Sequence, residues 1–308
     1  MTWFYYLAAA GFGLIFGSFF NVVIYRVPND ESLGARSRCP LCGEMIHWYD
    51  NIPLLSFVLL KGRCRRCGAG ISWRYPLVEL STAALFVITY WWSIAIVPGE
   101  LGVTTGRIAP ELFIGMLMVS VLIISTGVDL THGIIPNRVM YPSLVLMLAL
   151  VTGIALYRGQ PGRIGLAVAG GAIGGGFLFI AGLLYGAVFM RGHHWHPDGQ
   201  EENDGRGEAG PDTDDEDPAA VIPTGIGMGD VKLLAFTGMA LGYFHWYLVL
   251  VGLFLGFLTG ALVSIFLVIF AGHGRKDRLP FAPFLSAGCI AALLWGKQLV
   301  DVYLGLFR

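Results

Sequence analysis

Two aspartates stand at the ends of apolar segments, where a carboxylate is costly to keep. Asp129 ends one apolar run, and Asp230 opens another directly after Gly225-Ile-Gly-Met-Gly. Acidic residues in a lipid environment usually face a polar cavity and serve a function. Two neighbouring carboxyl groups cannot both ionise, so one keeps a proton while the other activates water. Such a pair is what peptide hydrolysis by an aspartic mechanism requires.

The carboxylates by themselves leave other interpretations open. Asp230 has the position of a helix cap, whereas the helix macrodipole disfavours an anion such as Asp129 at a helix C-terminus. A proton-coupled transporter also uses membrane acids. Protease, transporter and non-enzymatic scaffold therefore all remain. A third acid within an apolar run, Glu79, is expected to pair with Arg74 or Arg26.

Four of the five cysteines form two knuckles, Cys39-Pro-Leu-Cys42 and Cys64-Arg-Arg-Cys67, with 21 residues between them. Two such knuckles complete a tetrahedral shell of four thiolates for Zn²⁺. Two disulfides or an iron–sulfur cluster are the competing interpretations, and a reducing cytoplasmic loop disfavours disulfides. A closed four-ligand site predicts structural zinc. The remaining cysteine, Cys289, lies in an apolar run and is expected to act as a small hydrophobic residue.

Composition indicates that lipid surrounds these groups. The chain has 308 residues, 55% apolar and only 13% charged, which is too little charge to cover a soluble protein of this length. Runs long enough to cross the hydrocarbon layer predict an all-α polytopic membrane protein with about eight transmembrane helices. A small cytoplasmic zinc-binding loop domain with four cysteine ligands completes the predicted fold. The expected spans are 3–25, 75–97, 110–128, 139–157, 164–190, 231–242, 246–271 and 281–303.

Basic residues set the orientation. Lys and Arg accumulate in the loop after the first span and in the last loop between spans, which places both in the cytoplasm. The same parity puts Asp129 and Asp230 at the cytoplasmic face. Residues 192–222 are hydrophilic and acidic, and are expected to form a disordered cytoplasmic loop. The sequence contains no basic patch interleaved with aromatic residues, so nucleic acid is not expected as a partner.

Three regions follow from this pattern. Residues 1–25 form the first transmembrane helix, residues 26–74 the cytoplasmic zinc-binding loop, and residues 75–308 the membrane core that carries both aspartates. Membrane lipid is the expected surrounding of the first and third regions.

Motifs in order along nearly the whole chain resemble those of the type IV prepilin peptidases, membrane aspartyl proteases of the GxGD class. The matching segments are Gly17-Ser-Phe-Phe-Asn21, the two cysteine knuckles, Trp48-Tyr-Asp-Asn51-Ile-Pro53, Arg74-Tyr-Pro-Leu-Val-Glu79, Asp129 with Ile135-Pro136-Asn137, Gly227-Met-Gly-Asp230-Val-Lys232 and Pro280-Phe-Ala-Pro-Phe284.

The resemblance implies a bifunctional enzyme of the bacterial cytoplasmic (inner) membrane. Family members cut the leader from type IV prepilins or type II secretion pseudopilins at the cytoplasmic face, and then N-methylate the new N-terminus with S-adenosylmethionine. Asp129 and Asp230 match the catalytic aspartates. Gly62 matches a glycine associated with methyl transfer, and with Glu79 it is assigned to the methyl-donor site. The zinc loop favours the methylating branch over peptidases that do not methylate.

Overall fold

The computed structural model describes residues 2–98, 109–189, 227–270 and 280–306, and their regular structure is helical. Backbone N–H and C=O groups have no water to bind inside a bilayer, so an apolar chain satisfies them within helices. The elements are α1 (Thr2–Arg26), η1 (Trp48–Asn51), α2 (Leu55–Leu59), α3 (Arg74–Ala95), α5 (Glu111–His132), α6 (Asn137–Tyr157), α7 (Gly162–Phe189), α8 (Met228–Phe244), α9 (Trp246–Phe270) and α10 (Ala282–Gly305).

The eight expected spans all appear as helices. Within the described ranges, seven of them are long and apolar enough to cross a membrane. The eighth, α8, has 17 residues and begins three residues before the expected start at Val231. It is therefore the shortest of the eight, as its short apolar run predicted. The expected disordered acidic loop at 192–222 lies outside the described residues.

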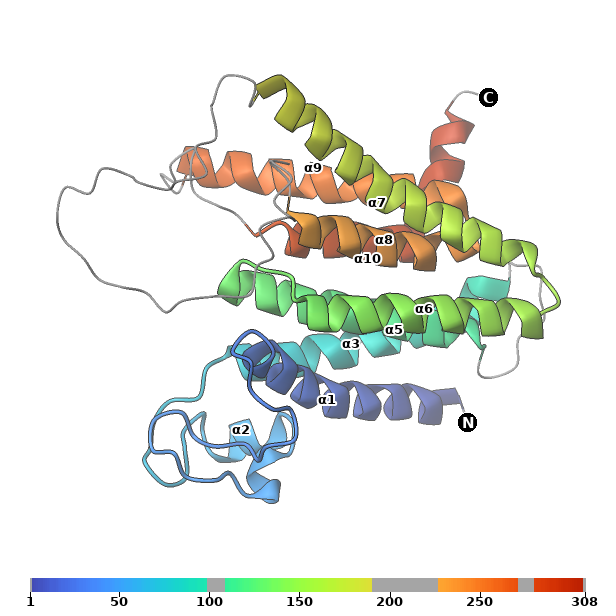
Figure 1. The fold of residues 1–308 in the computed structure, drawn as a ribbon. Helices are drawn as coiled ribbons and strands as arrows, with labels where there is room; N and C mark the ends of the chain where they lie inside the picture. Colours follow the sequence, from blue (N-terminus) through green and yellow to red (C-terminus); the bar gives the residue numbers. More distant parts are fainter. Residues whose placement is uncertain (1, 99–108, 190–226, 271–279, 307–308) are drawn as a thin grey trace, which may run out of the picture.

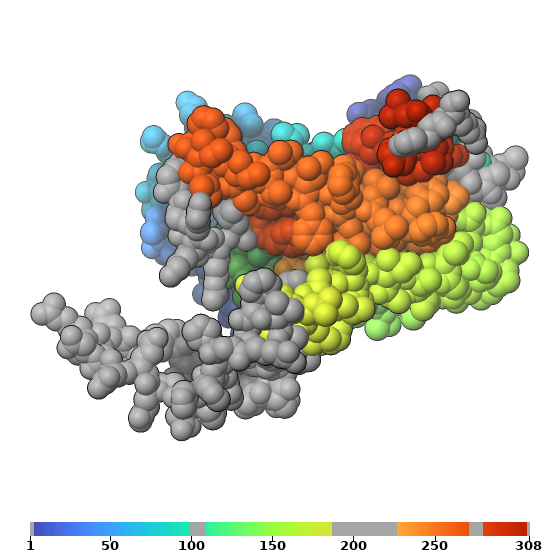
Figure 2. Space-filling model, turned by 90° about the horizontal axis from the view of Figure 1, so that it is seen from above, coloured from blue at the N-terminus to red at the C-terminus, as the bar shows by residue number. Residues whose placement is uncertain are grey.

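The helices form one bundle in which consecutive membrane segments run antiparallel. Figure 1 shows the C-terminal ends of α1 and α5 at the same end of the bundle as the N-terminal ends of α3, α6, α8 and α10. The zinc loop lies beside this end. Asp129 and Asp230 belong to α5 and α8 respectively, so the connectivity brings both aspartates to one end of the molecule. In Figure 2, α9 (orange) and α7 (yellow-green) lie side by side along one face.

Glycines allow α7 and α8 to approach closely. A Cβ added at Gly174 would lie 2.6 Å from the Leu234 carbonyl oxygen, and one at Gly170 would overlap the Gly238 carbonyl oxygen. Small residues let membrane helices pack backbone against backbone. Gly176 is an exception, because a Cβ added there would have no neighbour within 4 Å.

At the opposite end of the bundle, a buried ion pair joins α5 to the residue that follows α6. Glu111 is fully buried, and both of its carboxylate oxygens accept hydrogen bonds of 2.8 Å from the Arg158 guanidinium. Removing one partner of a buried pair leaves an uncompensated charge. The pair therefore fixes the register of α5, the helix that carries Asp129.

We expect Glu111→Ala to lower the free energy of unfolding by about 3–5 kcal/mol, because Arg158 loses its buried partner. Unfolding in detergent micelles, followed by circular dichroism, measures the change. The double variant Glu111→Ala/Arg158→Met should recover much of the loss. A loss below about 1 kcal/mol, the range of exposed pairs, would contradict this role.

Candidate functional site

Asp129 lies in the last turn of α5, which continues to His132 and ends where Gly133 adopts φ 66°. The left-handed conformation is accessible to glycine at little cost, so the chain can turn there. Asp129 is 9% exposed. Its Oδ2 accepts a 2.9 Å hydrogen bond from the backbone N–H of Ala282, the first residue of α10. The aspartate is thereby fixed at the junction of two helices.

This contact corrects the argument that capping cannot explain Asp129. Asp129 is at the C-terminal end of its own helix, but it also lies at the N-terminal end of α10, 153 residues further along the chain. A helix N-terminus has free N–H groups and favours an anion. The macrodipole of α5 disfavours an anion at Asp129, but the helix that stabilises this anion is α10.

Asp230 lies in the first turn of α8 and is half-buried. The N-cap of α8 is Gly227, and no side chain makes a capping hydrogen bond there, so capping does not account for Asp230. Asp129 is near enough to act electrostatically on Asp230. The structure thus brings together the two aspartates that the sequence places 101 positions apart.

Gly229 lets the start of α8 pack against the connection between α5 and α6. A Cβ at this position would lie 2.7 Å from the Cβ of Ile135. Lys232 makes a second link, because its Nζ donates a 2.6 Å hydrogen bond to Asn137 Oδ1 and lies 4.7 Å from the centre of the Tyr141 ring. These contacts hold Asp230 against the segment that follows Asp129.

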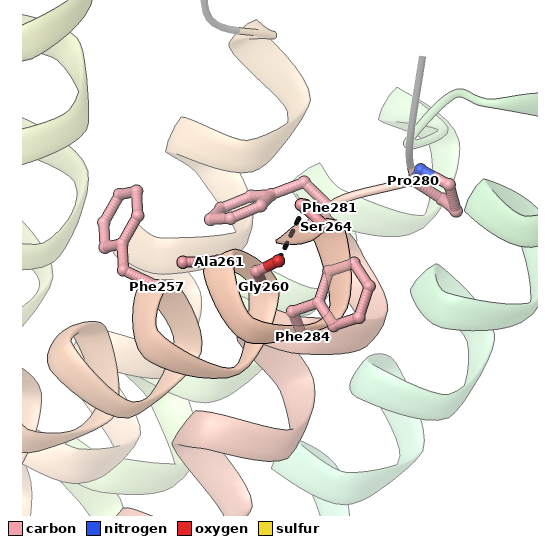
Figure 3. A pocket seen from close by; sticks show the side chains of 7 residues that line it. All are labelled: Phe257, Gly260, Ala261, Ser264, Pro280, Phe281 and Phe284. Atoms are coloured by element: carbon pink, nitrogen blue, oxygen red, sulfur yellow. Dashed lines mark hydrogen bonds between the residues drawn. The ribbon is translucent and has the colours of Figure 1, made fainter. Parts of the chain in front are cut away.

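An apolar cavity of about 320 Å³ adjoins the start of α10 (Figure 3). Its lining residues are Phe257, Gly260, Ala261 and Ser264 of α9, with Pro280, Phe281 and Phe284. The Ser264 hydroxyl donates to the Gly260 carbonyl oxygen at 2.7 Å, so the cavity wall is apolar. Phe281 directly precedes Ala282, the residue whose N–H binds Asp129. The motif at 280–284 therefore contributes to both the aspartate site and this cavity.

The four knuckle cysteines converge, with their Sγ atoms all within 4.8 Å of one another. Cys39 Sγ and Cys67 Sγ are 3.9 Å apart. Ligands about 2.3 Å from a tetrahedral zinc ion are about 3.8 Å from one another, so the cluster fits Zn²⁺. All five cysteines are free thiols in this structure, and the meeting of the four knuckle sulfurs at one point fits a single metal site better than two separate disulfides. Cys289 is 1% exposed in the apolar core, as expected for a small hydrophobic residue.

The two knuckles repeat one local structure 25 residues apart. Gly43 and Gly68 follow the second cysteine of each knuckle, and each has φ 70°, where glycine is strongly favoured. Single antiparallel bridges, Arg38 with Met45 and Arg63 with Gly70, close the two turns. Backbone N–H groups of Cys42 and Leu41 lower the pKa of the Cys39 thiol to about 6. Each turn thus presents its sulfurs to the same point. The thiolate form is favoured at Cys39, whereas desolvation and the hydrogen-bonded thiols around it raise the pKa of Cys67 to about 11.

Glu79 does not form the expected ion pair with Arg74 or Arg26, so that prediction is wrong. Its buried carboxylate accepts a 2.8 Å hydrogen bond from the Leu54 N–H, at the start of α2. The Arg26 guanidinium instead donates to backbone carbonyls of the zinc loop, the shortest bond being 2.7 Å to Ala35. Both side chains therefore connect the helix bundle to the loop.

Gly62 lies at the other end of α2. Its φ is 66°, its N–H donates to the Phe57 carbonyl at 2.8 Å, and a Cβ would be 3.2 Å from the Phe57 ring. Gly62 and Glu79 therefore contact opposite ends of one short helix. Two buried polar atoms near the start of α3 have no hydrogen-bond partner. One is Arg74 Nε, and the other is Oδ1 of Asn21 in α1, whose amide nitrogen donates to the Tyr75 carbonyl oxygen.

Sequence reasoning did not identify the Ala282 N–H as a partner of Asp129, nor Leu54 as the partner of Glu79. Both donors are backbone groups, and their residue types carry no signal. The motif Pro280-Phe-Ala-Pro-Phe284 does mark the first of them, because proline near a helix start is a common N-terminal feature.

Comparisons with known proteins match nearly the whole chain. The model of the bacterial peptidase A24 N-terminal domain matches residues 12–93, and that of the type IV leader peptidase family matches residues 116–265. The prepilin leader peptidase/N-methyltransferase of Aeromonas salmonicida is 31% identical over 99% of this chain and 95% of its own length. That of Bacillus subtilis is 31% identical over 95% of each chain.

A third relative of the same name, from Myxococcus xanthus, is 40% identical over 51% of this chain and 43% of its own length. No solved structure matches the chain. The two near-full-length relatives and the two family models cover the zinc loop and both aspartates in the observed order. The chain therefore belongs to the type IV leader peptidase family.

Proposed function

We propose that this protein cleaves the leader peptide of prepilins or pseudopilins, with Asp129 and Asp230 as catalytic residues, and then N-methylates the new N-terminus. The family membership supports the two activities. The observation that carries the catalytic assignment is the fixed position of Asp129, held by the Ala282 N–H beside Asp230.

The environments of the two carboxyl groups suggest different roles. Asp129 accepts a hydrogen bond from the N-terminus of α10, which stabilises a carboxylate. Among the residues that the structure describes, no such donor binds the Asp230 carboxyl group, and Asp230 lies beside this negative charge, so it is the member that carries the proton at the start. Asp129 takes a proton from water as the oxygen attacks the peptide carbonyl carbon, and Asp230 gives its proton to the carbonyl oxygen. Collapse of this intermediate breaks the C–N bond. Asp129 gives its proton to the leaving amine, and Asp230 takes one back from the diol, which restores both carboxyl groups to their starting states.

The apolar cavity beside Ala282 would receive an apolar side chain of the substrate close to the scissile bond. Burying an aromatic or aliphatic side chain there orients the peptide without any charged contact. The substrate enters from the cytoplasmic side in this proposal, because the basic loops mark that face of the inner membrane.

The zinc loop, residues 26–74, forms the second functional region, between the first helix at 1–25 and the membrane core at 75–308. Zn²⁺ bound by Cys39, Cys42, Cys64 and Cys67 organises this loop and leaves no open coordination position for hydrolysis. Methyl transfer is assigned to the region where the loop meets α3, because Glu79 and Gly62 fix α2 there.

Two buried groups at this junction fit a methyl donor. The unpaired Arg74 Nε–H suits a carboxylate and the unpaired Asn21 Oδ1 suits an ammonium group, and S-adenosylmethionine has both. When bound, S-adenosylmethionine supplies an electrophilic methyl group to the free amine. Glu79 and Gly62, the residues assigned to this site, contribute by keeping α2 in place.

Incubation of the purified protein with a prepilin and S-adenosylmethionine, followed by mass measurement of the N-terminus, tests both activities. We expect loss of the leader and the gain of one methyl group. An intact leader would contradict the protease assignment and favour a transporter or scaffold. Cleavage without methylation would identify a peptidase only.

Glu79→Ala and Gly62→Val should reduce methyl transfer and leave leader cleavage near the wild-type rate. Glu79→Ala removes the acceptor of the Leu54 N–H, and Gly62→Val forces a β-branched residue to φ 66° against the Phe57 ring. A left-handed conformation costs a non-glycine residue about 1–2 kcal/mol. Separate initial rates of cleavage and methylation measure the effect, with Gly11→Ala in α1, which has open space for a Cβ, as control. Equal loss of both activities would refute the division.

A further inference from the structure

The short helix α2 has an apolar outer surface, although it belongs to a loop rich in charge. Leu55 is 50% exposed, Val58 70% and Leu59 69%. Two tryptophans of the same region are also exposed, Trp48 at 81% and Trp73 at 71%. Contiguous exposed apolar side chains usually mark a surface that contacts a partner or a membrane.

Contacts with α3 fix the depth of α2 relative to the bilayer. The Leu54 N–H binds Glu79 at 2.8 Å, and the Phe57 ring lies 5.0 Å from the Trp73 ring. Glu79 is five residues inside α3, about 7.5 Å along its axis at roughly 1.5 Å per residue. Because α3 is long and apolar enough to cross a membrane, α2 lies at the depth where α3 enters the bilayer. Figure 1 shows α2 beside this end of the bundle.

The loop around α2 carries an excess of positive charge. Each of its acids is paired, in Asp50–Arg65, Glu44–Arg66, Glu31–Arg26 and Asp30–Arg138. In the part of the chain that the structure describes, Arg36, Arg38, Lys61 and Arg63 have no ion-pair partner. Lys61 and Arg63 follow α2 closely. Basic residues next to a membrane helix attract anionic lipid headgroups, and tryptophan favours the same layer.

We propose that α2, with Trp48 and Trp73, lies in the headgroup region of an anionic lipid bilayer and holds the zinc loop against the membrane surface. The apolar side chains of Leu55, Val58 and Leu59 enter the edge of the acyl layer, while the unpaired basic side chains contact lipid phosphates. This inference depends on the membrane topology and the loop contacts, and does not require either enzymatic activity.

Site-specific photocross-linking in the full-length, zinc-loaded protein tests the proposal. The photoreactive residue p-benzoylphenylalanine replaces Val58 or Leu59, in nanodiscs of phosphatidylcholine with or without phosphatidylglycerol and without added substrate. Glu44, an exposed residue of the first knuckle, is the matched control position. We expect lipid adducts at 58 and 59 but not at 44. Phosphatidylglycerol should raise the yield on the order of fivefold, the effect of one basic residue at an anionic surface.

Absence of lipid adducts at 58 and 59 would overturn the proposal, as would an equal yield at 44 or cross-links only to a second protein chain. Hydrogen exchange of the unmodified protein gives a second test that does not depend on the folding of these variants. Amides of residues 55–61 should exchange more slowly in nanodiscs containing phosphatidylglycerol than in phosphatidylcholine alone. Identical exchange in the two lipids would also overturn it.

Discussion

We expect Asp129→Asn and Asp230→Asn each to lower the rate of leader cleavage by roughly 10²–10⁴-fold or more, because a general acid or base contributes a factor of this size. Asparagine cannot take up or release the proton that the proposed reaction moves. Asp129→Asn is the more informative of the two, because its amide oxygen still accepts the hydrogen bond of the Ala282 N–H. It therefore preserves the capping of α10 and removes only the acid–base function. Single-turnover cleavage of a prepilin measures both variants.

Asp301→Asn is the matched control, because Asp301 is an exposed aspartate near the far end of α10. It should retain wild-type cleavage. All three variants should keep their zinc content and their unfolding temperature, so that loss of activity reports chemistry and not folding. Cleavage within about tenfold of wild type in either Asp129→Asn or Asp230→Asn, below the usual acid–base contribution, would exclude the pair as the catalytic residues.

Removal of the zinc ion should abolish methyl transfer while leader cleavage persists. Structural zinc contributes roughly 10–16 kcal/mol of binding free energy, and small zinc sites unfold without it. The loop at 26–74 then loses its order, and α2 loses the support of the knuckles on either side of it. The aspartate site is held by α5, α8 and α10, which do not depend on these cysteines.

Cys64→Ser or treatment with a strong chelator tests this expectation, with zinc content, cleavage and methylation measured on the same sample. Cys289→Ala is the control, since this buried cysteine is not part of the cluster. Return of methylation when zinc is added back to the chelated protein would link the loss to the metal. Full methylation by zinc-free protein, or cleavage lost together with methylation in a protein that remains folded, would contradict the separate roles.

Local patterns in the chain were sufficient to predict the helical membrane class, the eight apolar segments, the zinc cluster and the two candidate aspartates. These patterns are the lengths of apolar runs, the spacing of cysteines within knuckles, and carboxylates at the ends of apolar runs. The structure confirmed the convergence of the four thiols and the burial of Cys289. The roles of Asp129 and Asp230 stay predictions, which the Asn variants test.

The groups that hold the acidic side chains became known only from the packing of the helices. Asp129 is bound by a backbone N–H 153 positions away, and Glu79 by the backbone of Leu54 instead of an arginine. Every residue except proline has such an N–H, so no residue type marks the donor in the sequence. The position of α2 beside α3 could not be predicted from the sequence either, because a helix of 5 residues is too short to show a hydrophobic periodicity. Packing selects these partners, and it thereby places Asp129 beside Asp230 and α2 beside the start of α3.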